Sequence, residues 1–96
     1  MSADHDPVLR ELREQISDTD RTILDAVNTR LELVARIKAH KESRGISFLD
    51  PGRERSMLDD LTHRNHGPLS ADGLRELFGT ILDLTKREVA GDGGPG

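Results

Sequence analysis

The fold is decided by residues 7–43, which read PVLRELREQISDTDRTILDAVNTRLELVARIKAHKES. Asp6 and Pro7 form a good helix start, because aspartate caps a helix N-terminus and proline is tolerated at the first helical position. The seam positions recur at alternating spacings of three and four residues: Leu9, Leu12, Ile16, Thr19, Ile23, Ala26, Arg30, Leu33 and Ile37. This heptad spacing predicts one continuous helix with a single buried side, ended by Arg44 and Gly45.

The predicted helix is too long for a compact monomer of 96 residues. About 37 helical residues span roughly 55 Å at 1.5 Å per residue. A globule of this size has a radius of gyration of only about 12 Å. Because the remaining chain is too short to cover the whole seam, we expect an intertwined helical homodimer.

Two shorter helices are expected after the first. Asp50 and Pro51 repeat the start signal, and a second helix follows to about Arg64 with three apolar residues on one face: Met57, Leu58 and Leu61. Residues 65–68 have the composition of a turn. Ser70 then caps a third helix that runs from Ala71 to about Val89.

The third predicted helix has an inward face formed by Leu74, Leu77, Phe78, Ile81, Leu82, Leu84 and Thr85. A glycine within a helix costs about 1 kcal/mol relative to alanine, so Gly79 predicts a close contact with another helix. Residues 91–96, GDGGPG, are expected to be a disordered tail. The sequence therefore predicts an all-α fold, with one helical domain over residues 1–90.

Composition excludes several classes of function. The chain has 14 Lys and Arg against 18 Asp and Glu, a net charge of −4 that argues against a general nucleic-acid binder. It has no cysteine, no apolar run of the roughly 20 residues that span a membrane, and no secretory signal at its first residues. His63 and His66 lack the further ligands that a zinc site needs. We expect a soluble cytoplasmic domain with no metal and no cofactor.

Cations occupy positions where apolar residues are expected. Arg30 lies on the helical seam, and Lys41, eleven residues further on, returns to within roughly 20° of the same face. Arg13 lies on the flank of that seam. Each cation alone could extend from a helix edge into water. Two cations on one core face favour an internal anion site, because buried charges need partners.

A second charged cluster surrounds the start of the second predicted helix, in the sequence DPGRER of residues 50–55. Helix capping explains Asp50, and the positive end of the helix dipole favours Glu54. Capping does not explain Arg53, because a cation near a helix N-terminus is unfavourable to the dipole.

These motifs together resemble the all-helical chorismate mutases. The resemblance runs from about Leu9 to Val89 and is carried by three stretches in the family's order: Leu12–Ile16 with Asp20, residues 28–34, Ile37, Lys38 and Lys41; then residues 50–58; then residues 65–69 with Leu77, Phe78 and Ile81. The chain is similar to the domains fused to, or working beside, DAHP synthase, the first enzyme of the shikimate pathway. DAHP synthase is therefore a possible partner.

The resemblance implies a domain-swapped dimer of three-helix chains that converts chorismate to prephenate on the way to phenylalanine and tyrosine. It also implies roles for four cations. Arg13 would reach across the dimer to a substrate carboxylate, and Arg30 would clamp a carboxylate with two hydrogen bonds. Lys41 would bridge a carboxylate and the breaking ether oxygen, which makes it the main catalytic cation. Arg53 would support the carboxylate site.

The resemblance assigns the remaining site residues as well. Asp50 and Glu54 would hold the ring hydroxyl, and Thr85 would lie near the ring carboxylate. Val89 stands where the family usually has Gln or Glu as a second donor to the ether oxygen. Either the final helical turn is irregular, the second donor is missing, or the substrate differs. Glu88 is adjacent but points about 100° away on an ideal helix.

Two other functions stay open on the sequence. The same fold could act on 4-amino-4-deoxychorismate, whose amino group Asp50 and Glu54 could accept, or could eliminate pyruvate from isochorismate. Alternatively, the chain could be a weakly active regulatory or docking domain that works only in complex with a shikimate-pathway enzyme.

Overall fold

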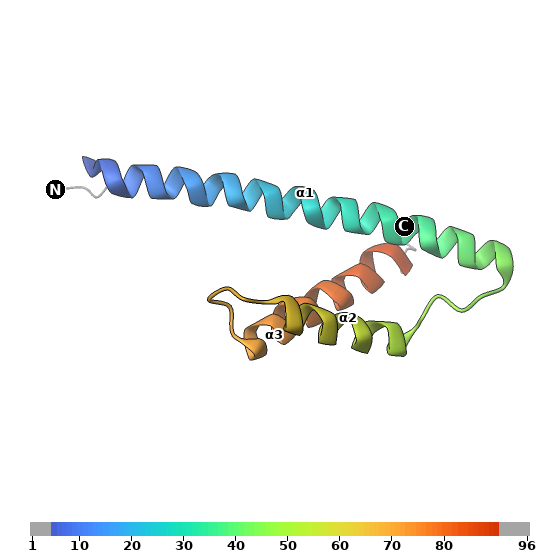
Figure 1. The fold of residues 1–96 in the computed structure, drawn as a ribbon. Coiled ribbons are helices and arrows are strands. Elements are labelled where there is room, and N and C mark those ends of the chain that lie inside the picture. Colours follow the sequence, from blue (N-terminus) through green and yellow to red (C-terminus); the bar gives the residue numbers. More distant parts are fainter. Residues whose placement is uncertain (1–4, 91–96) are drawn as a thin grey trace. The chain divides into compact units, whose positions relative to one another are not determined.

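The computed structural model describes residues 5–90, and these residues form helices joined by short connections (Figure 1). The elements are α1 (Pro7–Arg44), α2 (Pro51–Arg64), α3 (Ala71–Thr85) and a π-helical turn, η2 (Lys86–Ala90). The predictions of an all-α fold, three helices and a very long first helix are confirmed. The predicted tail over residues 91–96 lies outside the described residues.

Local hydrogen bonds and backbone conformation determine where α1 begins and ends. Asp6 Oδ1 accepts hydrogen bonds from the backbone N–H groups of Val8 (2.9 Å) and Leu9 (3.3 Å), which would otherwise lack partners. At the other end Gly45 has a φ of 68°, a left-handed conformation that glycine adopts without steric cost. The N–H of Ile46 then donates to the Lys41 carbonyl (2.8 Å), the bond that closes a glycine C-cap.

The chain divides into two units within α1, Met1–Glu32 and Leu33–Gly96. In the described part of the first unit the backbone forms one helix, and none of its residues is buried. Its seam residues are open to solvent, with Leu12 48%, Ile16 59% and Ile23 55% exposed. A lone helix has no core, so this unit needs a second surface to bury its apolar side.

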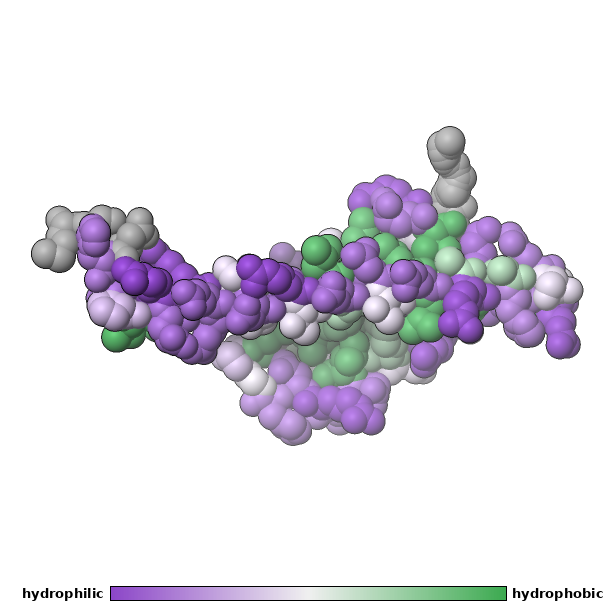
Figure 2. Space-filling view, turned by 90° about the horizontal axis from the view of Figure 1, so that it is seen from above, coloured by the Kyte–Doolittle hydropathy of each residue, from purple (hydrophilic) through white to green (hydrophobic). Residues whose placement is uncertain are grey.

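The second unit holds a hairpin in which α2 and α3 pack against each other (Figure 1). Among the described residues the buried ones are Leu74 (3% exposed) and Thr85 (6%), both on α3. Leu77 was expected to face inward but is 47% exposed, because packing by α2 leaves part of α3 uncovered. Figure 2 shows green hydrophobic surface open to solvent among purple hydrophilic residues.

The C-terminal end of α3 departs from the predicted α-helix. Ser70 caps α3 as expected, accepting a 2.9 Å hydrogen bond from the Gly73 N–H. The last five residues that the structure describes, however, form a π-helix rather than an α-helix. The close contact predicted at Gly79 is also absent, since a Cβ built there meets no atom within 4 Å in the described chain.

Candidate active site

Lys41 is held at the end of α1 by the connection that follows it. Its carbonyl accepts the Ile46 N–H, and its ammonium Nζ lies 3.4 Å from the carbonyl oxygen of Phe48. The side chain is half-buried. The glycine turn therefore folds the connection back over Lys41, so the ammonium contacts the chain two residues before Asp50.

The start of α2 is built by Asp50. Its Oδ1 accepts a 3.0 Å hydrogen bond from the Arg53 N–H, and its carbonyl accepts the Glu54 N–H at 3.2 Å. The capping interpretation of Asp50 is thus confirmed, which leaves its second carboxylate oxygen for other contacts. The Arg53 side chain is exposed, while Glu54 is half-buried.

Glu54 is paired with a residue that the sequence did not indicate. Lys86, at the start of η2, places its ammonium 3.3 Å from Glu54 Oε1 and 3.2 Å from Oε2. The two residues are 32 positions apart, so no local spacing could have predicted this contact. The ion pair ties the first turn of α2 to the junction between α3 and η2.

Thr85 is the last residue of α3, and Val89 lies four residues further on, within η2. Thr85 is buried, and its hydroxyl donates a 2.7 Å hydrogen bond to the Ile81 carbonyl. Val89 is half-buried within η2, while the side chain of Glu88 is 53% exposed and lies 3.7 Å from Arg87. Of the alternatives raised for Val89, an irregular final turn is therefore confirmed. In this structure the Glu88 side chain faces Arg87 and does not turn inward.

Arg13 and Arg30 lie on α1 in the first unit. Arg13 is exposed and Arg30 half-buried. Along one helix they are about 25 Å apart at 1.5 Å per residue, which is too far for both to contact one small molecule. If both bind the same substrate, they must come from different chains.

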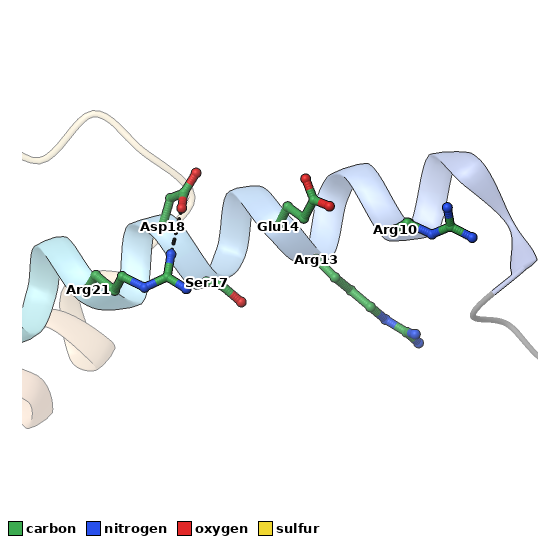
Figure 3. Close-up of a pocket in the computed structure, with 6 residues that line it drawn as sticks. All are labelled: Arg10, Arg13, Glu14, Ser17, Asp18 and Arg21. Carbon is green, nitrogen blue, oxygen red and sulfur yellow. Dashed lines mark hydrogen bonds and ion pairs between the residues drawn. The ribbon is translucent and has the colours of Figure 1, made fainter.

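A hollow of about 570 Å³ runs beside Arg13 and is lined by Arg10, Arg13, Glu14, Ser17, Asp18 and Arg21. Figure 3 shows Arg21 turned to Asp18, with which it forms a 2.7 Å ion pair, while Arg13 extends away from both acids. All six residues belong to one helix. A second surface is needed to close this hollow into a binding site.

The first turn of α2 thus carries a charged group formed by Asp50, Arg53 and Glu54, and the ion pair between Glu54 and Lys86 ties this group to the end of α3, where the buried Thr85 precedes Lys86. Lys41 is tied to the connection that leads into this group. Cations beside carboxylates can hold a small molecule that carries both carboxylate and hydroxyl groups. Across residues 5–90, three or more His, Asp or Glu side chains do not converge as a metal site would require, and no helix there is long and apolar enough to cross a membrane.

Comparisons with known proteins identify the family to which this chain is similar. The profile of the family described as chorismate mutase type II matches residues 12–89. The chain is 34% identical over 77 residues to a 4-amino-4-deoxychorismate mutase of Streptomyces venezuelae, covering 77% of this chain and 73% of that protein. It is 44% identical over 50 residues to the T-protein of Enterobacter agglomerans, but this match covers 52% of this chain and spans only 13% of that longer protein.

Solved structures give the same result. The chain matches form II of the chorismate mutase from Thermus thermophilus with a TM-score of 0.83 and 30% identity, over 88% of this chain and 96% of that one. Form I of that enzyme matches with a TM-score of 0.78 and 32% identity, over 80% and 96% of the two chains. The resemblance that the sequence motifs indicated is confirmed at the level of the family and the fold.

Proposed function

This chain belongs to the chorismate mutase type II family, and we propose that it catalyses the Claisen rearrangement of chorismate to prephenate. The observation that carries the proposal is the match to solved chorismate mutases over 96% of their length. The sequence identity of 30–32% supports a shared activity as well as a shared fold. The charged residues at the end of α1 and the start of α2 supply the chemistry that this substrate needs.

The reaction is unimolecular, so it does not require a nucleophile or a proton shuttle from the protein. It must hold a dicarboxylate in a compact conformer and stabilise the negative charge that develops on the breaking ether oxygen. Arginine and lysine suit both tasks, because charge-assisted hydrogen bonds are strong and become stronger where water is excluded.

We assign the cations as follows. Lys41 donates to the ether oxygen and a carboxylate, giving up its long hydrogen bond to Phe48 when substrate binds. Arg30 clamps a carboxylate in a two-bond geometry that lysine could not reproduce. Arg53 supports the carboxylate site from the first turn of α2. Arg13 comes from the partner chain, which its separation from Arg30 along α1 supports.

The remaining residues surround the ring. Glu54 accepts the hydrogen bond of the ring hydroxyl, with the second carboxylate oxygen of Asp50 as a further acceptor nearby, and the buried Thr85 lies beside the ring carboxylate. Val89 closes the side of the site where relatives place a second donor. Because valine cannot donate, the rate on chorismate depends mainly on Lys41.

The active form is an intertwined homodimer. The exposed seam of the first unit supports this state, since residues such as Ile23 (55% exposed) have no core to enter within that unit. Sedimentation velocity should give a dimer at micromolar concentration. Ile23→Asp should break it, whereas Asn28→Asp, which adds the same charge about 140° from Ile23 around α1, should not. A compact, active wild-type monomer would contradict both the dimer and the shared site.

A second function is favoured by one specific observation, the 34% identity to a 4-amino-4-deoxychorismate mutase. Two carboxylates at the start of α2 could accept hydrogen bonds from an amino group. The two functions share a reaction type and a fold, and differ in the substituent on ring carbon C4.

The test is to supply the purified chain separately with chorismate, 4-amino-4-deoxychorismate and isochorismate, each with and without DAHP synthase. Conversion of chorismate by the chain alone supports the leading proposal. Preference for the amino compound supports the second function. Conversion that appears only with the synthase would identify a domain that needs a partner, and absence of any conversion by a folded dimer would contradict the proposal.

A further inference from the structure

The ion pair between Lys86 and Glu54 differs in kind from neighbouring ion pairs on the helices. Arg21–Asp18, Lys38–Glu42 and Arg64–Asp60 join residues within one helical turn. Lys86 instead reaches from η2 to α2, and both Glu54 oxygens lie within 3.3 Å of its ammonium. The Glu54 side chain is also only 28% exposed, against 76%, 63% and 59% for the three helical acids.

Lys86 continues the backbone of α3 with right-handed helical dihedral angles, φ −60° and ψ −42°. It is the first residue of the π-helical turn, and its N–H is shared between the carbonyls of Leu82 and Asp83. A π-helical turn is rare and shifts the residues after it out of α-helical register, and such turns are frequent at functional sites. A partly exposed ion pair of this kind adds little to stability.

The pair presents two different groups to a ligand. The Glu54 carboxylate can only accept hydrogen bonds, and the Lys86 ammonium can only donate them. A hydroxyl satisfies both at once, because it donates to the carboxylate and accepts from the ammonium. An ammonium substituent can only donate, and it would bring a second positive charge beside Lys86, which is unfavourable in a partly covered site.

We propose that Lys86 is a specificity-determining residue that selects a hydroxyl over an ammonium group on the substrate ring. The inference rests on the proposed function, because it takes Glu54 to face the C4 substituent. It adds that the positive charge of Lys86 repels the ammonium group of 4-amino-4-deoxychorismate. This repulsion acts even though Asp50 and Glu54 could accept hydrogen bonds from an amine.

The experiment compares kcat/KM for chorismate and 4-amino-4-deoxychorismate in the full chain and three variants. Lys86→Met keeps the length of the side chain and removes its charge, and should shift the ratio toward the amino compound by at least about tenfold. Lys86→Arg keeps the charge and should retain the wild-type preference. Arg87→Met is the matched control, because Arg87 carries the neighbouring charge but lies 3.7 Å from Glu88, and it should leave the ratio unchanged.

Dissociation constants of the two compounds, measured by titration calorimetry, test the same preference without relying on turnover. Circular dichroism confirms that each variant is folded. The inference is overturned if Lys86→Met alters both substrates equally, if Arg87→Met shifts the ratio as much, or if the wild type prefers the amino compound. A folded wild type that binds either compound but converts neither would overturn the proposed function, and the binding ratio would then decide the role of Lys86.

Discussion

The ammonium of Lys41 donates a 3.4 Å hydrogen bond to the backbone carbonyl of Phe48, while the Lys41 carbonyl accepts the N–H of Ile46. Both ends of this lysine are therefore tied to the connection between α1 and α2. A bond of 3.4 Å is longer than the usual range and correspondingly weak. The backbone bond fixes the position of the lysine. The weak side-chain bond could be exchanged for a hydrogen bond to a substrate oxygen, which is the role that we propose for Lys41.

The first prediction concerns that ammonium. Lys41→Ala should lower kcat on chorismate by at least about 100-fold, the scale of losing one preorganised donor to a developing oxyanion. Lys38→Ala is the control, because Lys38 forms a 2.8 Å ion pair with Glu42 one turn along the same helix. Steady-state kinetics of both variants gives the answer. Near-native turnover by Lys41→Ala on every candidate substrate would reduce Lys41 to a structural residue.

The second prediction concerns the distance between Arg13 and Arg30 along α1. Arg13→Ala and Arg30→Ala should each be nearly inactive. When the two variants are unfolded together and refolded, half of the dimers contain one of each chain, and one of their two sites has both arginines. Activity should then recover to about one quarter of the wild-type value for a two-fold symmetric dimer.

Refolding each variant alone supplies the baseline for this experiment. A mixture that is no more active than that baseline would mean that both arginines of a site come from one chain. The measurement therefore tests the shared site directly, independent of how large each single effect is.

Local signals in the sequence were sufficient to predict the helix boundaries, except for the C-terminal end of α3. Asp50 and Ser70 cap α2 and α3 through hydrogen bonds to residues three positions ahead, and Gly45 ends α1 through its own backbone conformation. Such interactions depend only on neighbours in the chain, so residue type and spacing are enough. The residue pattern singled out Arg30 and Lys41 as cations on an apolar helix face, but the role of each charged residue came only from the family resemblance, because no local rule places them around one ligand.

Features that depend on packing were not predictable in the same way. The contact of Lys86 with Glu54 joins residues 32 positions apart, and the π-helical turn that begins at Lys86 has no signature in the sequence. Leu77 follows the helical period of the inward residues, yet it is 47% exposed because the single chain provides no surface for it. A periodic pattern shows which face is apolar, and it does not show which chain covers that face.

The third prediction uses two glycines of α3 as matched probes. A Cβ at Gly79 meets no atom within 4 Å, so Gly79→Ala should raise the free energy of unfolding by about 0.5–1 kcal/mol through helix propensity. A Cβ at Gly73 would lie 2.9 Å from Leu69 Cδ1 and 3.1 Å from the capping oxygen of Ser70, so Gly73→Ala should gain less or lose stability. Urea unfolding at a fixed chain concentration measures both. Loss of stability in Gly79→Ala would show that a second chain packs against that position.

The fourth prediction concerns Val89, which lies half-buried in η2, at the position where the family resemblance implies a donor to the ether oxygen. Val89→Gln should raise kcat on chorismate, because an amide donor to a charged oxygen is worth about 1.5–3 kcal/mol. Val89→Met is the control, since methionine is about as long as glutamine and has no donor, and it should give no increase.

In Val89→Glu only the protonated carboxyl can donate, so its rate should fall as pH rises, whereas the wild-type rate should change little over that range. A steep fall in the wild type would instead mean that Glu88, which is 53% exposed beside Arg87, turns inward when substrate binds and acts as the donor.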